Sequence, residues 1–519
     1  MKSRIYVSIF LLFCFLHNKP VLAQVITSAQ IDQLVERTLK TFEVPGIAVA
    51  VVKDGKVIHS KGYGVRSINS TQKVDANTLF GIASNSKAFT TATLGILIDD
   101  GKLNWDDKVI DYIPEFRLYH SYVTEDFTIR DLLTHRSGLG LGAGDLMFFP
   151  DSSDFTLKDV IHNLRYLKQV SGFRTKYDYD NLLYMVAGEV VKRASGLSWE
   201  EFVESRIMKP LQMDHSAASF SRLKDKSNVI DAHAVIEGKL RTVRRGRLDV
   251  GNSAGGINSS INDLSKWVTM QLNGGKYGDG LSKTLFSSKV QDEMWTPQTI
   301  IPVRNPGPYN THFSSYGLGW GLSDVKGYKQ ITHTGGLPGM VTQVTLLPEL
   351  KLGIIVLTNQ QTGAAFTSIT NQIKDSYFGI TGTDRVKEYS ERLRENTANA
   401  DKATDEVWKV VEAQKGVAKP DLNFYAGTYH DNWLGDVSIA VKNDRLQFVA
   451  KRSPRLTGEL FFYKGNTFVV KWNDRSLEAD AFVMFGLDYE GKPVSMKMKA
   501  ISPLTDFSYD FHDLEFVKK

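Results

Sequence analysis

Cysteine is almost absent from this chain of 519 residues, which contains a single one, Cys14. A disulfide within the chain is therefore impossible, and a zinc site built on several cysteines is excluded. The 11 histidines are scattered and show no His-Glu-x-x-His pattern, so the sequence predicts no metal. The glycine-rich runs lack the lysine of a phosphate-binding loop and the dinucleotide pattern, so we also expect no cofactor.

A strong excess of charge is also lacking. The chain has 63 Lys and Arg against 58 Asp and Glu, a formal net charge of +5. Lys2, Arg4 and Lys19 lie in residues 1–23, which hold no acidic residue, so the rest of the chain carries a formal +2. The basic excess that could suggest a polyanionic partner therefore lies largely in residues 1–23, and we predict no nucleic-acid partner.

Long apolar runs are missing except near the N-terminus. The run from Ile5 to Leu16 follows two basic residues, and the segment ends at the small residue Ala23. This order is typical of a secretory signal peptide, and the run is too short to span a bilayer. We predict a signal peptide at 1–23, a periplasmic or secreted location and no stable membrane insertion. A buried N-terminal helix or an uncleaved anchor is the alternative.

Residues 24–382 combine strand-like and helical segments. Gly46–Val52 is typical of a buried strand, and Asp54-Gly55 predicts a hairpin turn after it. Asn85–Asp100 is apolar on most sides, which predicts a central buried helix. Further helices and strands are expected at Ile26–Phe42, Asn181–Arg193, Val341–Leu347, Gly353–Thr358 and Gly363–Phe378. The order favours an α/β sheet with a large, mostly helical insertion.

The composition changes after residue 382. Residues 383–420 are rich in Arg, Lys and Glu, which indicates a charged helical linker. Residues 421–519 contain short alternating stretches separated by turns, such as Val437–Val441 and Val494–Lys499. This spacing predicts a small antiparallel β-barrel or sandwich. We expect its aromatic side chains to fill the interior, with stacking on sugars as the alternative.

Ser-x-x-Lys places a hydroxyl and an amine one helical turn apart, so that the lysine can take the serine proton. The pattern occurs four times, at Ser70/Lys73, Ser84/Lys87, Ser221/Lys224 and Ser323/Lys326. Only the pair Ser84/Lys87 follows an apolar stretch, Leu79–Ala83, and precedes a long, mostly apolar helix. This context places Ser84 at a helix N-terminus and buries Lys87, which lowers the pKa of the lysine. A helix-capping serine with a solvated lysine is the alternative.

Two more motifs point to the same chemistry. Tyr179-Asp180-Asn181 is the only Tyr-x-Asn in the chain, and a tyrosine near an ammonium can hold a depressed pKa and relay protons. His333-Thr334-Gly335-Gly336 precedes a predicted strand, whose edge offers a backbone N–H to an oxyanion. Taken alone, Tyr179 could be a core residue and His333 a turn residue. The three motifs in this order favour one site of nucleophilic catalysis.

The chain resembles the penicillin-recognising serine hydrolases, which include class C β-lactamases, DD-carboxypeptidases, D-aminopeptidases and related esterases. Supporting stretches are Val44-Pro45-Gly46, Thr128–Leu139, Tyr316–Gly321 and Leu357-Thr358-Asn359. The resemblance implies an α/β (α+β) fold with an antiparallel sheet flanked by helices and a mostly helical insertion. The C-terminal 100 residues or so resemble the small lipocalin-like β-barrel often appended to these hydrolases.

The resemblance implies Ser84 as the acylated nucleophile, with Lys87 and Tyr179 sharing proton transfer. Which of the two is the principal base stays open. The implied oxyanion hole consists of the backbone N–H groups of Ser84 and Gly336. The implied substrate-binding residues are Asn181, His333, Thr334 and Gly336.

Two departures bear on the substrate. His333 stands where many class C β-lactamases have lysine, and a histidine is mostly neutral near pH 7. A fixed cation for a substrate carboxylate is then less assured, which favours a peptidase or esterase. Asp180 stands where serine is usual, and its carboxylate would repel an anionic substrate or pair with a cationic one if it points inward.

A competing pattern is Gly251-Asn252-Ser253-Ala254-Gly255, which matches the nucleophile elbow Gly-x-Ser-x-Gly but lacks a clear strand before it. We therefore predict an exported serine hydrolase that acts through an acyl-enzyme on a small peptide or ester. The alternatives are a class C-like β-lactamase and a penicillin-binding sensor that holds a β-lactam without turnover. The oligomeric state stays open.

Overall fold

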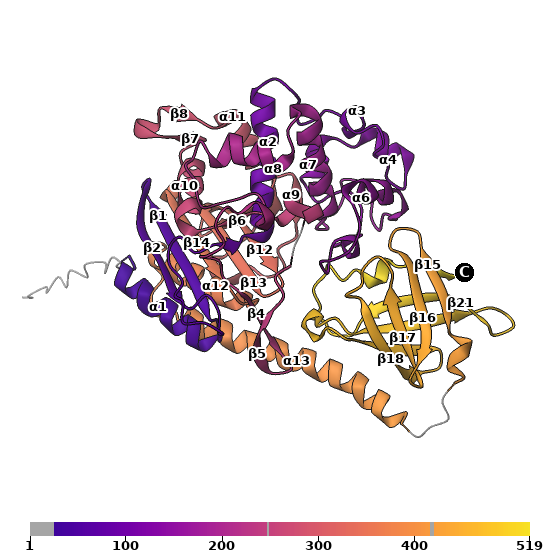
Figure 1. Cartoon of the computed structure of the whole chain (residues 1–519). Coiled ribbons are helices and arrows are strands. Elements are labelled where there is room, and N and C mark those ends of the chain that lie inside the picture. Colours follow the sequence, from indigo (N-terminus) through magenta and orange to yellow (C-terminus); the bar gives the residue numbers. More distant parts are fainter. Residues whose placement is uncertain (1–24, 247–248, 416–419) are drawn as a thin grey trace, which may run out of the picture.

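The computed structural model describes residues 25–246, 249–415 and 420–519 (Figure 1). The predicted signal peptide at 1–23 lies outside these residues. Among the described residues, no helix is both long and apolar enough to cross a membrane.

An antiparallel sheet of eight strands forms the centre of the first region, in the order β2-β1-β14-β13-β12-β11-β10-β9. The strands are β1 (Gly46–Lys53), β2 (Lys56–Gly64), β9 (Thr299–Ile301), β10 (Ser314–Tyr316), β11 (Gly321–Val325), β12 (Tyr328–Leu337), β13 (Met340–Leu347) and β14 (Leu352–Thr358). β1 is buried on both faces, because Ala48 and Ala50 join one hydrophobic core and Val49 and Val51 the other. This explains the continuous apolar run of its sequence.

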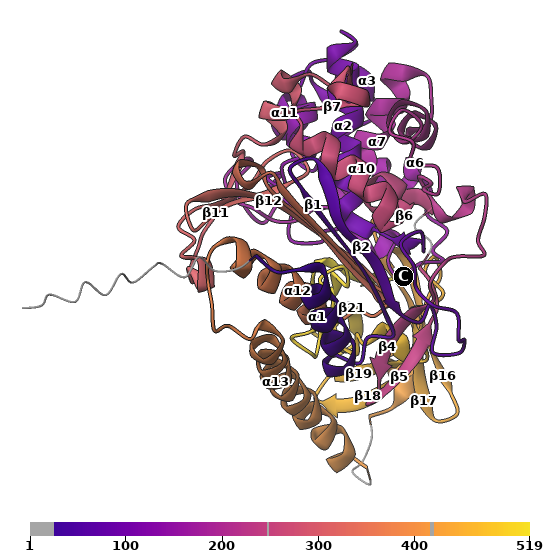
Figure 2. The same cartoon turned by 90° about the vertical axis from the view of Figure 1, so that its left-hand side faces the viewer.

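Helices cover both faces of this sheet (Figure 2). One face carries α1 (Ser28–Thr41) and α12 (Gly363–Tyr377), which join the second core. α1 begins at Ser28 because Thr27 forms a capping box with Gln30. α10 (Ile261–Leu272) packs against β1 and β14 on the other face.

The part of the chain between β2 and β9 is an insertion into the sheet, and it is mostly helical. Its centre is α2 (Ser86–Asp99), which contacts α7 (Leu182–Ser195) and α9 (Asn252–Gly255). Phe89 of α2 stacks on Trp267 of α10 with ring centroids 4.0 Å apart. The other helices are α3 (Val109–Tyr112), α4 (Ser121–Asp126), α5 (Ile129–Leu132), α6 (Leu157–Asn163), α8 (Trp199–Val203) and α11 (Ser288–Met294). Short strand pairs are β3 (Phe80–Gly81) with β6 (Asn258–Ser259), β4 (Ala232–Ile236) with β5 (Lys239–Val243), and β7 (Lys276–Tyr277) with β8 (Lys283–Thr284).

A long helix, α13 (Arg385–Ala413), leads from the first region to the second (Figure 1). The second region is a closed antiparallel barrel. Its strands are β15 (Gly427–Asp431), β16 (Gly435–Lys442), β17 (Arg445–Ala450), β18 (Thr457–Lys464), β19 (Thr467–Trp472), β20 (Ala481–Leu487), β21 (Pro493–Ala500) and β22 (Phe516–Lys518). Pairing of Tyr429 with Lys518 joins the first strand to the last, so the fold is a barrel and not a sandwich.

Candidate active site

Ser84 lies on a tight turn between β3 and α2. A short 3₁₀ helix, η1 (Ala83–Asn85), carries it directly before the first turn of α2. Ala83 has a φ of +50°, a left-handed conformation that is costly for a residue with a side chain. The turn is pressed against β12, because a Cβ on Gly335 would lie 2.2 Å from the Ile82 carbonyl oxygen. Only glycine at 335 permits this approach of the His-Thr-Gly strand to the serine.

Lys87 lies one turn further along, with no exposed surface. Its Nζ lies 3.2 Å from Ser84 Oγ, 2.7 Å from Asn181 Oδ1 and 2.9 Å from the Ala254 carbonyl oxygen. Burial lowers the pKa of Lys87 to about 7, against the opposing influence of Asp145. A neutral amine can donate to the amide and carbonyl oxygens and keep its lone pair for the Ser84 proton.

Tyr179 stands on the other side of the lysine, whose Nζ lies 4.8 Å from the centre of the tyrosine ring. Rings of His135 and Phe507 crowd it, with centroids 4.1 Å and 5.7 Å away. Desolvation raises the pKa of Tyr179 well above its usual value, and the interaction with Ser84 only partly opposes this. The expected depressed pKa of Tyr179 is therefore wrong, because burial outweighs the nearby amine. With its pKa raised in this way, the Tyr179 phenol keeps its proton near pH 7.

The His-Thr-Gly segment lies on β12 beside the serine turn. His333 is buried, and burial lowers its pKa to about 3, so the ring is neutral. Its Nδ1 lies 2.6 Å from the Thr334 carbonyl oxygen and its Nε2 lies 2.9 Å from the Tyr316 hydroxyl. These contacts fit an Nδ1–H that donates and an Nε2 that accepts. Thr334 and Gly336 are exposed, and a Cβ on Gly336 would meet open space.

A cavity of about 730 Å³ opens over Ser84, a size suited to a small organic ligand. The sequence-predicted residues Ser84, Tyr179, Asn181, His333, Thr334 and Gly336 all line it, and Lys87 lies beneath Ser84. The barrel supplies part of the wall through residues such as Leu477, Glu478, Leu504, Asp506 and Phe507. Within residues 25–246, 249–415 and 420–519, no Lys or Arg lines the cavity.

Comparisons with known proteins agree with this geometry. A family model described as Beta-lactamase matches residues 31–376, more than half of the chain. The chain belongs to the Beta-lactamase family. The resemblance inferred from the motifs is thereby confirmed. A second model, described as a domain of unknown function (DUF3471), matches residues 413–518.

Two curated proteins are similar in sequence to this Beta-lactamase-family protein. "Unguisins hydrolase ungD" of Aspergillus violaceofuscus is 29% identical over 438 residues, 79% of this chain and 76% of that protein. "Protein flp" of Staphylococcus aureus strain MW2 is 26% identical over 342 residues, 64% of this chain and 62% of that protein.

The fold also matches a solved structure, the "octameric penicillin-binding protein homologue from Pyrococcus abyssi". The TM-score is 0.61 at 20% identity, over 95% of this chain and 100% of that one. The likeness therefore concerns the fold of the family and extends over both regions of the chain.

Two side chains singled out from the sequence lie away from the cavity. Asp180 is buried and accepts a hydrogen bond of 2.6 Å from the Ser137 hydroxyl. Its carboxyl is therefore turned away from a substrate. Ser253 of the Gly-x-Ser-x-Gly pattern is buried on α9, where a Cβ on Gly188 would lie 2.5 Å from its Oγ. The site uses this segment through the Ala254 carbonyl, which accepts from Lys87.

Residues without a recognisable motif complete the site. Asp145 is buried beneath Asn181, whose Nδ2 donates to its Oδ2 over 2.7 Å. His135 and Tyr316 lie in stretches that support the family resemblance, yet no spacing rule placed them beside Tyr179 and His333. Ser508 comes from the barrel. No local sequence signal marks Asp145 or Ser508.

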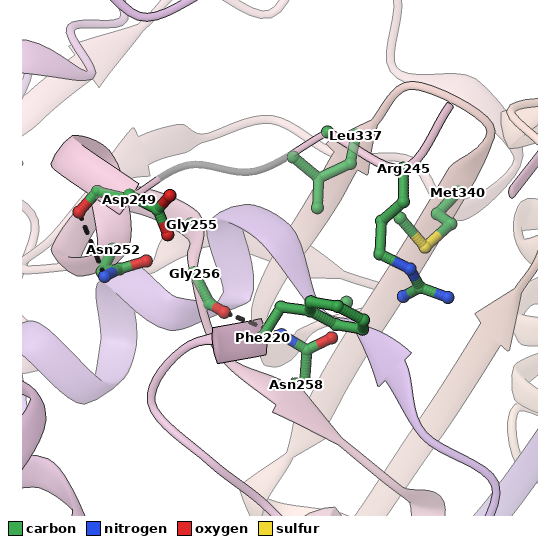
Figure 3. A pocket seen from close by; sticks show the side chains of 11 residues that line it. Phe220, Arg245, Asp249, Asn252, Gly255, Gly256, Asn258, Leu337 and Met340 are labelled. Atoms are coloured by element: carbon green, nitrogen blue, oxygen red, sulfur yellow. Dashed lines mark hydrogen bonds between the residues drawn. The ribbon is translucent and has the colours of Figure 1, made fainter. Parts of the chain in front are cut away.

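A second, much smaller pocket lies beside the main cavity and shares Gly255 and Leu337 with it. Arg245 and Met340 stand at one side and Asp249 and Asn252 at the other (Figure 3). Its volume of about 20 Å³ is enough for about one water molecule. This pocket is too small to hold a substrate.

Proposed function

We propose that this protein is an exported serine hydrolase that cleaves an amide or ester through an acyl-enzyme on Ser84, as a peptidase or esterase. The observation that carries the proposal is the contact between Ser84 Oγ and Lys87 Nζ at 3.2 Å, at the base of the cavity. Export rests on the sequence of residues 1–23 alone.

In the proposed reaction, Ser84 Oγ attacks the substrate carbonyl carbon while its proton passes to the neutral Lys87 amine. The carbonyl oxygen takes up the negative charge beside the backbone N–H groups of Ser84 and Gly336. Collapse breaks the bond to the leaving group, which takes a proton from Lys87 directly or through the Tyr179 hydroxyl. Water then attacks the acyl-enzyme with the same groups in reverse order, which releases the acid and restores Ser84.

The chemistry of the cavity favours a substrate without an essential carboxylate. His333 is neutral, and the described residues that line the wall include the acidic Glu478 and Asp506 but no lysine or arginine. A β-lactam carries a carboxylate, which would find no fixed cation among the described lining residues. A small ester or a peptide cleaved away from its C-terminal carboxylate therefore fits better. The name of the Aspergillus relative, a hydrolase, supports turnover over mere binding.

The direct test is covalent labelling of the purified full-length protein with a fluorophosphonate and with a fluorescent penicillin. We expect the fluorophosphonate to label the wild type, and Ser84→Ala to abolish the label. Ser253→Ala is the matched control, because Ser253 is the rival nucleophile and lies buried outside the cavity. It should retain the label. Labelling that survives Ser84→Ala would overturn the assignment.

A substrate panel then separates the activities. Turnover of short-chain esters or of small peptides supports the proposal. Rapid hydrolysis of a cephalosporin would assign a β-lactamase instead. A stable penicillin adduct without turnover of any substrate would assign a binding or sensor protein.

A further inference from the structure

We use "hydrolase region" for the part of the chain before α13, which holds the eight-stranded sheet and Ser84. The segment between β21 and β22 of the barrel, residues 501–515, reaches into this region, and we call it the strap. Two backbone N–H groups of the hydrolase, those of Gly144 and Leu146, donate to the Asp510 carboxyl of the strap over 2.6 Å and 3.3 Å. A Cβ on Gly142 would lie 2.7 Å from the Phe507 carbonyl oxygen, so the two backbones are closely packed. The strap thus clamps the turn that carries Asp145.

Asp145 is fully buried and connects the strap to the catalytic lysine. Its Oδ2 accepts from Asn181 Nδ2 and from Ser508 Oγ, each over 2.7 Å. The other end of the same amide, Asn181 Oδ1, accepts from Lys87 over 2.7 Å. A continuous chain of hydrogen bonds therefore runs from the barrel through Asp145 and Asn181 to Lys87.

We propose that Asp145 is a positioning residue that acts on Lys87 through the Asn181 amide, and that Ser508 makes the barrel part of this acid–base network. The proposal rests on the proposed function, since it concerns the same lysine. It assigns a catalytic consequence to the barrel, which otherwise only forms a wall of the cavity.

The electrostatics agree with this geometry. Burial raises the pKa of Asp145 to about 7, although the hydrogen bonds from Ser508 and Asn181 favour its charged form. The two groups also influence each other, because the charge of Asp145 raises the pKa of Lys87 and the charge of Lys87 lowers the pKa of Asp145. An ionised Asp145 stabilises the ammonium form of Lys87, and a neutral Asp145 favours the free amine. Asp145 also interacts electrostatically with other titratable groups, which are Asp506 and Asp510 of the strap, Tyr179 and Asp180.

A purely structural carboxyl would behave differently. If Asp145 only anchored the turn, a replacement of the same shape would change stability and leave the titration of Lys87 in place. The pH dependence of Ser84 acylation separates the two roles, because the free amine of Lys87 is the reactive form and its pKa sets the acid limb of the profile.

The experiment measures the second-order rate of fluorophosphonate labelling against pH for full-length wild type, Asp145→Asn and Ser508→Ala. Asp145→Asn removes the charge that holds the lysine protonated, so the acid limb should move to lower pH by about one unit. Ser508→Ala removes a hydrogen bond to the carboxylate. More Asp145 is then neutral, and the shift should be smaller and in the same direction.

Ser502→Ala is the matched control, because Ser502 lies on the same strap and its hydroxyl accepts from the Leu504 N–H instead of contacting Asp145. Its profile should coincide with that of the wild type. If wild type and Asp145→Asn give the same pH profile, the inference about Asp145 is overturned. The proposed function would still stand in that case, provided that the label depends on Ser84. If Asp145→Asn does not fold, an unmoved profile in Ser508→Ala overturns the inference. A wild type that is never labelled at Ser84 would overturn both proposals.

Discussion

The hydrolase region and the barrel contribute to one cavity in different ways. In the hydrolase region, the proposed reacting groups come from short motifs: Ser84 and Lys87 lie one turn apart on η1 and α2, and Tyr179 lies in the loop before α7. In the barrel, the contributing side chains come from the strap, an irregular segment outside the strands. Side chains that belong to a short motif can therefore be predicted from the sequence even when the motifs lie far apart, whereas a side chain such as Ser508, which belongs to no motif, cannot.

Aromatic side chains pack inside the barrel. Phe448, Phe468, Trp472 and Phe485 are buried there, and Phe448 and Trp472 meet edge to face at 5.3 Å. Aromatic packing is what a small closed barrel needs for stability. The barrel borders the cavity that contains Ser84 only partly, through residues such as Leu477 and, on the strap, Leu504.

The largest effect is expected when the barrel core is broken with Trp472→Ala. This change leaves a large cavity and removes the donor to the Ala479 carbonyl, a bond of 2.7 Å. We expect the free energy of unfolding to fall by about 3–5 kcal/mol. Chemical denaturation followed by circular dichroism gives this value, and fluorophosphonate labelling at each denaturant concentration gives the state of the site.

Labelling should be lost together with the barrel, because the strap leaves when the barrel unfolds. Trp267→Ala is the companion variant in the hydrolase core, where Trp267 stacks on Phe89. It should lose the label at its own transition. Labelling that persists in Trp472→Ala after the barrel has melted would show that the two regions work independently.

A smaller loss, of about 100-fold in the acylation rate, is expected for Tyr179→Phe, because this is the scale of lost general acid–base help. Tyr184→Phe is a close control. Both rings flank Lys87, at 4.8 Å and 5.3 Å from its Nζ, but the Tyr184 hydroxyl donates to the Leu133 carbonyl and does not line the cavity. An equal loss in both variants would assign the effect to packing around the lysine, and an unchanged rate in Tyr179→Phe would remove the phenol from the mechanism.

Much of the fold follows from local pattern. The apolar run Gly46–Val52 and the turn Asp54-Gly55 correctly predict β1 and the hairpin to β2, because both residues of the turn adopt the left-handed conformation that favours this pair. The choice between barrel and sandwich could not be made. Alternation is the same in both, and closure depends on the pairing of β15 with β22 at opposite ends of the region.

The site divides in the same way. Short motifs predict Ser84, Lys87, Tyr179 and Asn181 as site residues. In the structure, Ser84, Tyr179 and Asn181 surround the Lys87 amine. Asp145 could not be found, because its partner Ser508 is 363 residues away and nothing periodic connects them. The pKa of Tyr179 could not be predicted either, since it depends on how completely the neighbouring rings exclude water.

The smallest effect is expected at the rim of the interface between the two regions. Arg452 of the barrel donates to Asp154 over 2.6 Å and to Asp159 over 3.2 Å, and its guanidinium lies 3.8 Å from the centre of the Phe155 ring. The Arg452 side chain is 31% exposed and the Asp154 side chain 68%, so water and salt screen the pair. We expect Arg452→Ala to cost less than about 1 kcal/mol, and less still in 1 M salt.

Arg452→Lys separates the components of that small cost. It keeps the charge but loses the planar contact with Phe155, so a variant that matches Arg452→Ala would assign the cost to stacking. Denaturation at low and high salt measures both. A loss above about 2 kcal/mol in Arg452→Ala, well beyond an exposed pair, would mean that the rim holds the barrel in place. The contacts of Asp510 and Ser508 on the strap would then not be what holds the barrel against the hydrolase region.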